Sequence, residues 1–180
     1  MRLRSLLATA LLSLVTFSAL ATCDEPERSE FDFWLGEWTI HQRFPAGEEW
    51  IEQPAATSVT KILDGCALIE RWSGLVQYPW AGMEKGEPME GFSIRYYLPE
   101  EKVWRIQWMD SRNPFLSDGM YGTIDDGYGE FEPRNREGET QWTRIVFERK
   151  AGDHVYWHLD LTSDGGENWR TIWIMDMKRR

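Results

Sequence analysis

In a strand over residues 67–72, Glu70 shares one face with the apolar Leu68 and Trp72, where a carboxylate is an unusual neighbour. A buried carboxylate without a cation costs several kcal/mol, so it needs a partner. Arg95, Arg105 and Arg144 lie in later segments of the same alternating type, and each could face Glu70 across a shared interior. Such a pair could orient the polar end of a ligand in an apolar cavity. The pattern also fits a purely structural ion pair, or a Glu70 that faces solvent.

His154 and His158 have a spacing that places two zinc ligands on one face of a helix. In an extended strand the same spacing covers roughly 13 Å, which is too far for one ion. His158 alone could act as an axial haem ligand if it pointed into a cavity. We therefore expect no metal site and no cofactor, with haem bound through His158 as the alternative.

Other catalytic patterns are weak in this chain. Glu70 and Asp110 are the in-strand carboxylates that glycoside hydrolysis could use, but that chemistry depends on their separation, which a sequence does not give. The sequence contains no phosphate loop, dinucleotide fingerprint or G-x-S-x-G motif. A binding protein is favoured over an enzyme.

The segments that carry these residues have the two-residue period of β-strands. In residues 102–109, Trp104, Ile106 and Trp108 alternate with polar neighbours, and pairs such as Asp126-Gly127 mark tight turns between segments. The sequence predicts strands over 34–43, 55–63, 66–77, 89–98, 102–109, 118–125, 128–132, 140–149, 154–162 and 169–178. So many short antiparallel strands should close on themselves to remove their edges. We expect an all-β protein with a single antiparallel up-and-down barrel of about 8–10 strands, preceded by a signal peptide.

Eleven tryptophans in 180 residues exceed what a barrel wall needs for packing and indicate an aromatic pocket. Because a shift of one residue reverses the facing of a whole strand, the assignment of inward residues depends on the strand boundaries. The predicted ligand site consists of Glu70, Trp72, Tyr96, Trp104, Trp108, Arg144, Trp157, His158 and Trp173.

The N-terminus has the pattern of a signal peptide. Arg2 and Arg4 precede an uncharged apolar run, and residues 19–21 (Ala-Leu-Ala) match a cleavage site. We expect a signal peptide over 1–21, a tail over 22–30, a barrel domain over 31–180, and an exported protein that is periplasmic or secreted. The net charge of −10 is unsuited to nucleic acids and to anionic membrane surfaces.

Cys23 has two alternative fates. Residues 20–23 resemble a bacterial lipobox, in which Cys23 would be acylated and anchor the protein in the envelope, although Thr22 replaces the usual small residue. In an oxidising compartment Cys23 could instead form a disulfide with Cys66, the only other cysteine. The two fates exclude each other.

Two terminal motifs and two central ones suggest a family. The chain begins its domain with F-x-F-x-x-G-x-W over 31–38 and ends with D-G-G-x-x-W over 164–169, Trp173 and the pair Arg179-Arg180; 65–70 and 108–111 lie between them. Together these motifs resemble a bacterial domain-of-unknown-function family of exported calycin-like barrels, related in shape to lipocalins and nitrobindins. The resemblance implies the fold of residues 31–180 and no agreed activity. On physical grounds, Gly36 should bend the first strand and Trp38 should plug one end of the barrel.

The sequence therefore favours binding of a small apolar or amphipathic molecule in an aromatic-lined cavity. An isomerase, cyclase or hydrolase that uses the same cavity is one alternative, and a structural or interaction protein of the cell envelope is another. We expect a small hydrophobic partner, no nucleic acid, and membrane contact only through a lipid on Cys23. The oligomeric state stays open.

Overall fold

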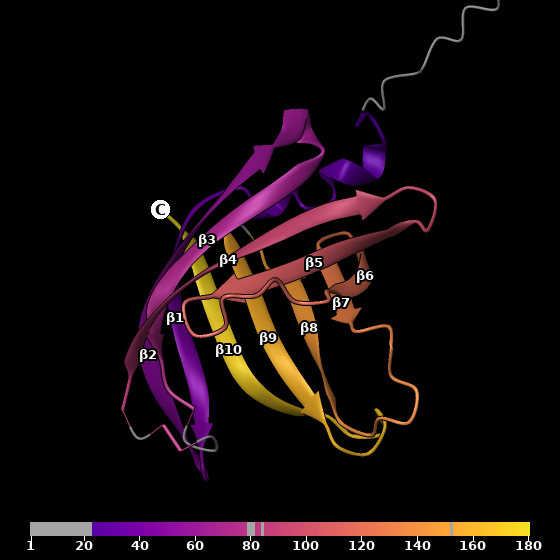
Figure 1. The fold of residues 1–180 in the computed structure, drawn as a ribbon. Helices are drawn as coiled ribbons and strands as arrows, with labels where there is room; N and C mark the ends of the chain where they lie inside the picture. The colour runs from indigo at the N-terminus through magenta and orange to yellow at the C-terminus, as the bar shows by residue number, and fades with distance from the viewer. Residues whose placement is uncertain (1–22, 79–81, 84, 152) are drawn as a thin grey trace, which may run out of the picture.

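The computed structural model describes residues 23–78, 82–83, 85–151 and 153–180, so the predicted signal peptide lies outside the described residues. Ten antiparallel strands in these ranges form one closed barrel (Figure 1). Each strand pairs with its neighbours in sequence, and the first strand pairs with the last. The predicted all-β, up-and-down barrel is confirmed. The strands are β1 (Gly36–Ala46), β2 (Glu49–Ile62), β3 (Ala67–Val76), β4 (Glu87–Leu98), β5 (Val103–Asp110), β6 (Met120–Asp125), β7 (Tyr128–Glu132), β8 (Trp142–Arg149), β9 (His154–Thr162) and β10 (Arg170–Arg179).

Alternation along each strand separates the interior of the barrel from its outer surface. In β5, Trp104 and Ile106 are buried inside, whereas Arg105 and Gln107 bond to backbone carbonyls of the loop that follows the strand. The same period holds in β9, where Val155 and Trp157 are buried in the core. The core is thus built from one face of a single curved sheet.

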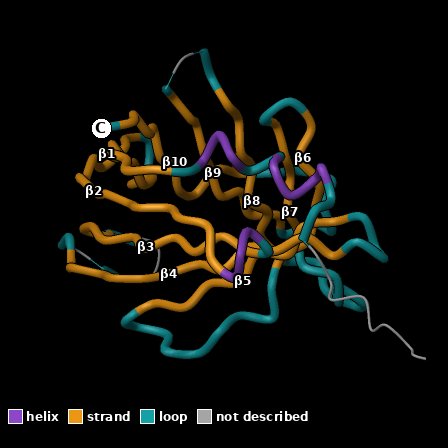
Figure 2. The backbone as a smooth tube through the Cα atoms, turned by 90° about the horizontal axis from the view of Figure 1, so that it is seen from above, coloured by secondary structure: helices purple, strands orange, loops and turns teal. Residues whose placement is uncertain are grey.

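One end of the barrel is closed by the segment that precedes β1. Two short 3₁₀ turns, η1 (Pro26–Ser29) and η2 (Asp32–Trp34), lie across the strand ends (Figure 2). Phe31 packs edge-on against Phe147 at 5.4 Å, and Trp34 stacks on Trp38 at 5.6 Å between ring centroids. Phe31, Trp34 and Trp38 are all completely buried. No helix in the described ranges is long and apolar enough to cross a lipid bilayer.

The two terminal motifs meet where β1 pairs with β10. Gly36 has a φ of +116°, which strongly favours glycine, and a Cβ there would also collide with the Arg179 guanidinium. That guanidinium lies 4.3 Å from the Trp38 ring centroid and donates to the carbonyls of Phe33 and Leu35. Arg179 therefore holds the start of β1 against the end of the last strand.

A disulfide joins Cys23 to Cys66, with 5.0 Å between their Cα atoms. Cys66 follows η3 (Leu63–Gly65), the turn between β2 and β3, and its carbonyl accepts a 2.9 Å hydrogen bond from Arg28 Nη1. The predicted tail is thereby fixed onto the closed end of the barrel over its described residues. A Cys23 sulfur in this disulfide has no free valence for an acyl chain.

Candidate functional site

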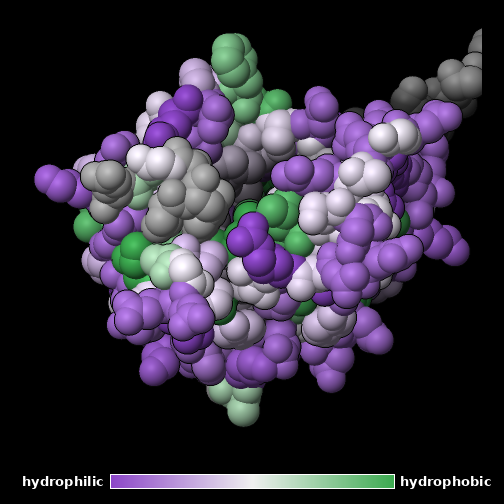
Figure 3. Space-filling model, turned by 90° about the horizontal axis from the view of Figure 1, so that it is seen from below, coloured by the Kyte–Doolittle hydropathy of each residue, from purple (hydrophilic) through white to green (hydrophobic). Residues whose placement is uncertain are grey.

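The barrel encloses a cavity of about 850 Å³ that opens at the end opposite the 3₁₀ turns. Figure 3 looks at this end and shows hydrophobic side chains inside a hollow with a polar rim. Residues of the β5–β6 and β7–β8 loops, including Asp118 and Glu139, form part of its wall at the mouth. Apolar and aromatic side chains from the strands form most of the rest: Trp72, Trp108, Phe147, Trp157, Leu161 and Trp173.

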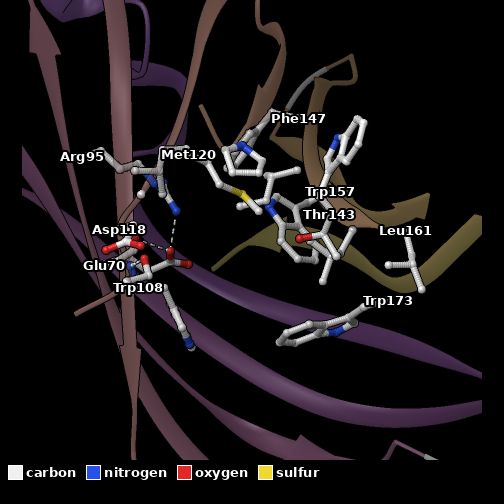
Figure 4. A pocket seen from close by; sticks show the side chains of 18 of the residues that line it. Glu70, Arg95, Trp108, Asp118, Met120, Thr143, Phe147, Trp157, Leu161 and Trp173 are labelled. Carbon is white, nitrogen blue, oxygen red and sulfur yellow. Dashed lines mark hydrogen bonds and ion pairs between the residues drawn. The ribbon is translucent and has the colours of Figure 1, made fainter. Parts of the chain in front are cut away.

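A buried ion pair between Glu70 and Arg95 lies in the cavity wall, where Arg95 meets the rings that close the barrel (Figure 4). The two residues are 5% and 3% exposed. Glu70 Oε2 accepts from Arg95 Nη2 and, at 2.9 Å, from Ser93 Oγ, while Oε1 accepts from Thr57 Oγ1 at 3.0 Å. Three donors, two from β4 and one from β2, therefore fix this carboxylate.

Arg95 is held mainly by aromatic rings on its other sides. Its guanidinium carbon lies 5.4, 5.2 and 5.1 Å from the ring centroids of Phe31, Trp34 and Phe147. Burial lowers the pKa of Arg95, and the charge of Glu70 acts in the opposite direction. Its Nε and Nη1 atoms are buried and have no acceptor among the described residues.

The side wall of the cavity is a chain of tryptophans. Trp173 packs edge-on against Trp72 at 5.7 Å and Trp157 at 5.3 Å, and Trp72 contacts Trp108 at 6.3 Å between centroids. A Cβ on Gly91 would collide with the Trp108 ring, so the absence of a side chain at Gly91 gives this indole its place. Each of these four rings therefore packs against at least one other.

Five of the nine residues predicted for the ligand site line this cavity: Glu70, Trp72, Trp108, Trp157 and Trp173. Trp104 also points inward but lies at the closed end, where it contacts Phe31 at 4.9 Å and donates from Nε1 to Glu30. It is not among the residues that line the cavity.

Tyr96, Arg144 and His158 face outward, which corrects the prediction that they line the cavity. Tyr96 follows the inward Arg95 and donates to Gln107 on the outer surface, and Arg144 and His158 likewise alternate with cavity-lining neighbours. His158 would therefore not reach a haem inside the cavity. The other two histidines, His41 and His154, pair with acids, and no histidine lies among the described cavity-lining residues.

Two of these outward residues, Arg144 and His158, belong to a polar cluster around Asp160. His158 Nδ1 lies 2.8 Å from Asp160 Oδ1, and Thr171 Oγ1 and Arg144 Nε donate at 2.7 and 3.0 Å. Burial alone would raise the pKa of Asp160, but the hydrogen bonds from His158, Thr171 and Arg144 outweigh it and lower the pKa to about 2. This cluster fastens β8, β9 and β10 together on the outside of the barrel.

Several residues of the site were not in the predicted set. The partner of Glu70 is Arg95, one of three candidates, and Ser93 and Thr57 complete its shell. Glu70 on β3 pairs with Ser93 on β4, and Arg95, two residues after Ser93, faces the same side of the sheet. Knowledge of this register would have identified Arg95 as the partner of Glu70. Asp110, the other carboxylate considered, accepts from Trp108 Nε1 and from backbone amides of the following turn.

The chain matches no known family model, and no curated protein is significantly similar to it in sequence. The closed ten-stranded barrel is compatible with a calycin-like fold. Membership in the domain-of-unknown-function family that its motifs resemble stays a prediction.

Proposed function

We propose that this protein binds one small apolar or amphipathic molecule inside the barrel. The observation that carries the proposal is the open, largely apolar cavity of about 850 Å³. Small-molecule sites are typically concavities of roughly 300–1,000 Å³ with apolar walls and few polar groups. A barrel that served only as a scaffold would gain stability by filling this space with side chains, because an unfilled interior forfeits packing contacts.

The Glu70–Arg95 pair supports an amphipathic ligand. It is the one ion pair inside the cavity among the described residues, at the end where Trp34 closes the barrel. A hydrophobic pair of similar size would be no less stable in such a place. The pair is therefore better explained as an anchor that orients one polar end of the ligand.

Titration of the purified protein with a lipid and aromatic library, followed by intrinsic tryptophan emission, tests this function. Native mass spectrometry should then show one ligand per chain. Two variants of β8 give a matched control: Thr143→Trp narrows the cavity and should weaken binding, whereas Glu148→Trp adds the same ring on the other face of the strand. Binding that is equal in both variants, or no binding by any compound, would refute the proposal.

We further propose that the protein is exported and matures by cleavage after Ala21, without lipid at Cys23. The signal-like residues 1–21 and the Cys23–Cys66 disulfide support this, since disulfides persist in oxidising compartments. The intact mass of protein from an envelope fraction, measured before and after reduction, tests it. A mass gain of two hydrogens on reduction is expected, and an acylated Cys23 would overturn this part of the proposal.

A further inference from the structure

Buried hydrogen-bond donors without acceptors gather around this cavity. They are Nε and Nη1 of Arg95 and the indole Nε1 atoms of Trp34 and Trp72, none of which has an acceptor among the described residues. All three side chains line the cavity and are at least 97% buried. Buried polar groups are nearly always paired in folded proteins, so four such donors beside one cavity require an explanation.

Three other indole N–H groups of the cavity wall do have acceptors. Trp108 donates to Asp110 at 2.7 Å, Trp142 to Glu132 at 3.2 Å, and Trp173 to Gln42 at 2.9 Å. The unpaired donors therefore belong to Arg95 and Trp34, which pack together at the closed end, and to Trp72 in the tryptophan wall.

The unpaired polar atoms of the described cavity lining are all donors, and none is an acceptor. Every buried, unpartnered polar atom of the described cavity-lining side chains is a nitrogen donor. Glu70 does not pair with these donors; its two oxygens accept from Thr57, Ser93 and Arg95 Nη2. The rings around Arg95 compensate its charge in part, but a ring face is a weaker acceptor than an oxygen atom. A ligand with an acceptor oxygen at its inner end would complete the site.

The charges around the cavity favour a neutral ligand over an anionic one. Arg95 is the only cation among the described cavity-lining residues, and Glu70 already neutralises it. Asp118 and Glu139 add two carboxylates to the wall, and the chain as a whole has a net charge of −10. An anionic head group would meet repulsion at the mouth and an additional desolvation cost inside.

Given the proposed function, on which this inference rests, we propose that the ligand is a neutral apolar molecule with a carbonyl-type oxygen, and that this oxygen accepts from Arg95 with Trp72 as a second donor. Trp72 lies beside Trp108 and Trp173, so the ketone or aldehyde carbonyl would sit inside the aromatic wall while the apolar remainder extends toward the mouth.

Four probes of matched size test the ligand class: octanophenone, octylbenzene, para-octylbenzoate and para-octylbenzylamine. Tryptophan emission and native mass spectrometry give their affinities for the full-length mature protein. Octanophenone should bind about tenfold or more tighter than octylbenzene, because it completes a hydrogen bond to a charged donor. The benzoate and the benzylamine should both bind more weakly than the ketone.

Two variants test the assigned donors. Glu70→Gln combined with Arg95→Met removes the pair without leaving a buried charge, and it should bind octylbenzene as before while losing the preference for the ketone. Trp72→Phe removes the N–H together with one of the two fused rings, and should reduce the preference for the ketone over octylbenzene. Arg144→Met, on the outer surface, removes an arginine elsewhere and should leave the preference for the ketone over octylbenzene unchanged.

The outcomes separate the two proposals. If none of the four probes binds and the wider library also fails, the proposed function falls. If octylbenzene binds but the ketone gains nothing over it, or if the benzoate or amine binds best, only the ligand class is overturned. A ketone preference that survives in the Glu70→Gln, Arg95→Met variant would overturn the role of Arg95.

Discussion

Arg95→Met alone would leave the Glu70 carboxylate inside the barrel without a cation. Glu70 would keep its hydrogen bonds from Thr57 at 3.0 Å and Ser93 at 2.9 Å. Removing one partner of a buried ion pair costs about 3–5 kcal/mol, and the two retained bonds favour the lower end, about 3 kcal/mol. In a domain of this size, such a loss lowers Tm by about 6–12 °C.

The double variant Glu70→Gln, Arg95→Met should behave differently. It contains no buried charge, and Gln at position 70 can accept from one of the two hydroxyl groups with its amide oxygen and donate to the other with its amide nitrogen. We expect its free energy of unfolding to lie within about 1 kcal/mol of the wild type, because uncharged replacements of buried ion pairs are often neutral or stabilising.

Urea unfolding of the wild type, both single variants and the double variant gives the complete cycle. The reasoning would be refuted if the free energy of unfolding of Arg95→Met lay within about 1 kcal/mol of the wild type. It would also be refuted if the double variant were as unstable as Arg95→Met.

Three further predictions concern interactions that stabilise the barrel around the cavity. Changing Cys23 and Cys66 together to serine should cost about 4 kcal/mol, because the disulfide closes a loop between residues 43 apart; an unchanged thermal midpoint would contradict this. Arg179→Met removes two bonds to carbonyls and the contact with Trp38, and should cost about 2 kcal/mol in urea unfolding, with a loss below about 0.5 kcal/mol counting against it. The pKa of Asp160, lowered to about 2 from 3.8, means that its stabilisation is complete above about pH 4 and is lost as the pH falls toward 2. Asp160→Asn should therefore flatten the stability curve over this range, and an unchanged slope would argue against the cluster.

The fold could be predicted because turn pairs and two-residue alternation recur along the whole chain. Two predicted strands, 128–132 and 154–162, have the bounds of β7 and β9. The first strand was placed too early, at 34–43 instead of 36–46, because Trp34 continues the apolar pattern although it belongs to a 3₁₀ turn. An aromatic residue that plugs a barrel and one that lines a strand look alike in sequence.

The site was only partly predictable because facing depends on register. Arg144 and His158 stand next to inward residues, and a shift of one position exchanges the two faces. Arg95 follows Ile94 and precedes Tyr96 and Tyr97, so alternation alone does not show that it points inward. The unpaired donors could not be predicted, since they depend on which side chains lie within hydrogen-bond distance in three dimensions.

The central claim is that a ligand binds inside the barrel, against the tryptophan wall. The most direct measurement is a ¹H–¹⁵N correlation spectrum of the indole N–H groups during a titration with octanophenone, assigned with single Trp→Phe variants. The account predicts large shifts for Trp72 and Trp157, which line the cavity, and none for Trp50, which is exposed on β2. Shifts at Trp50 without shifts at Trp72 and Trp157, or an unchanged spectrum, would contradict it.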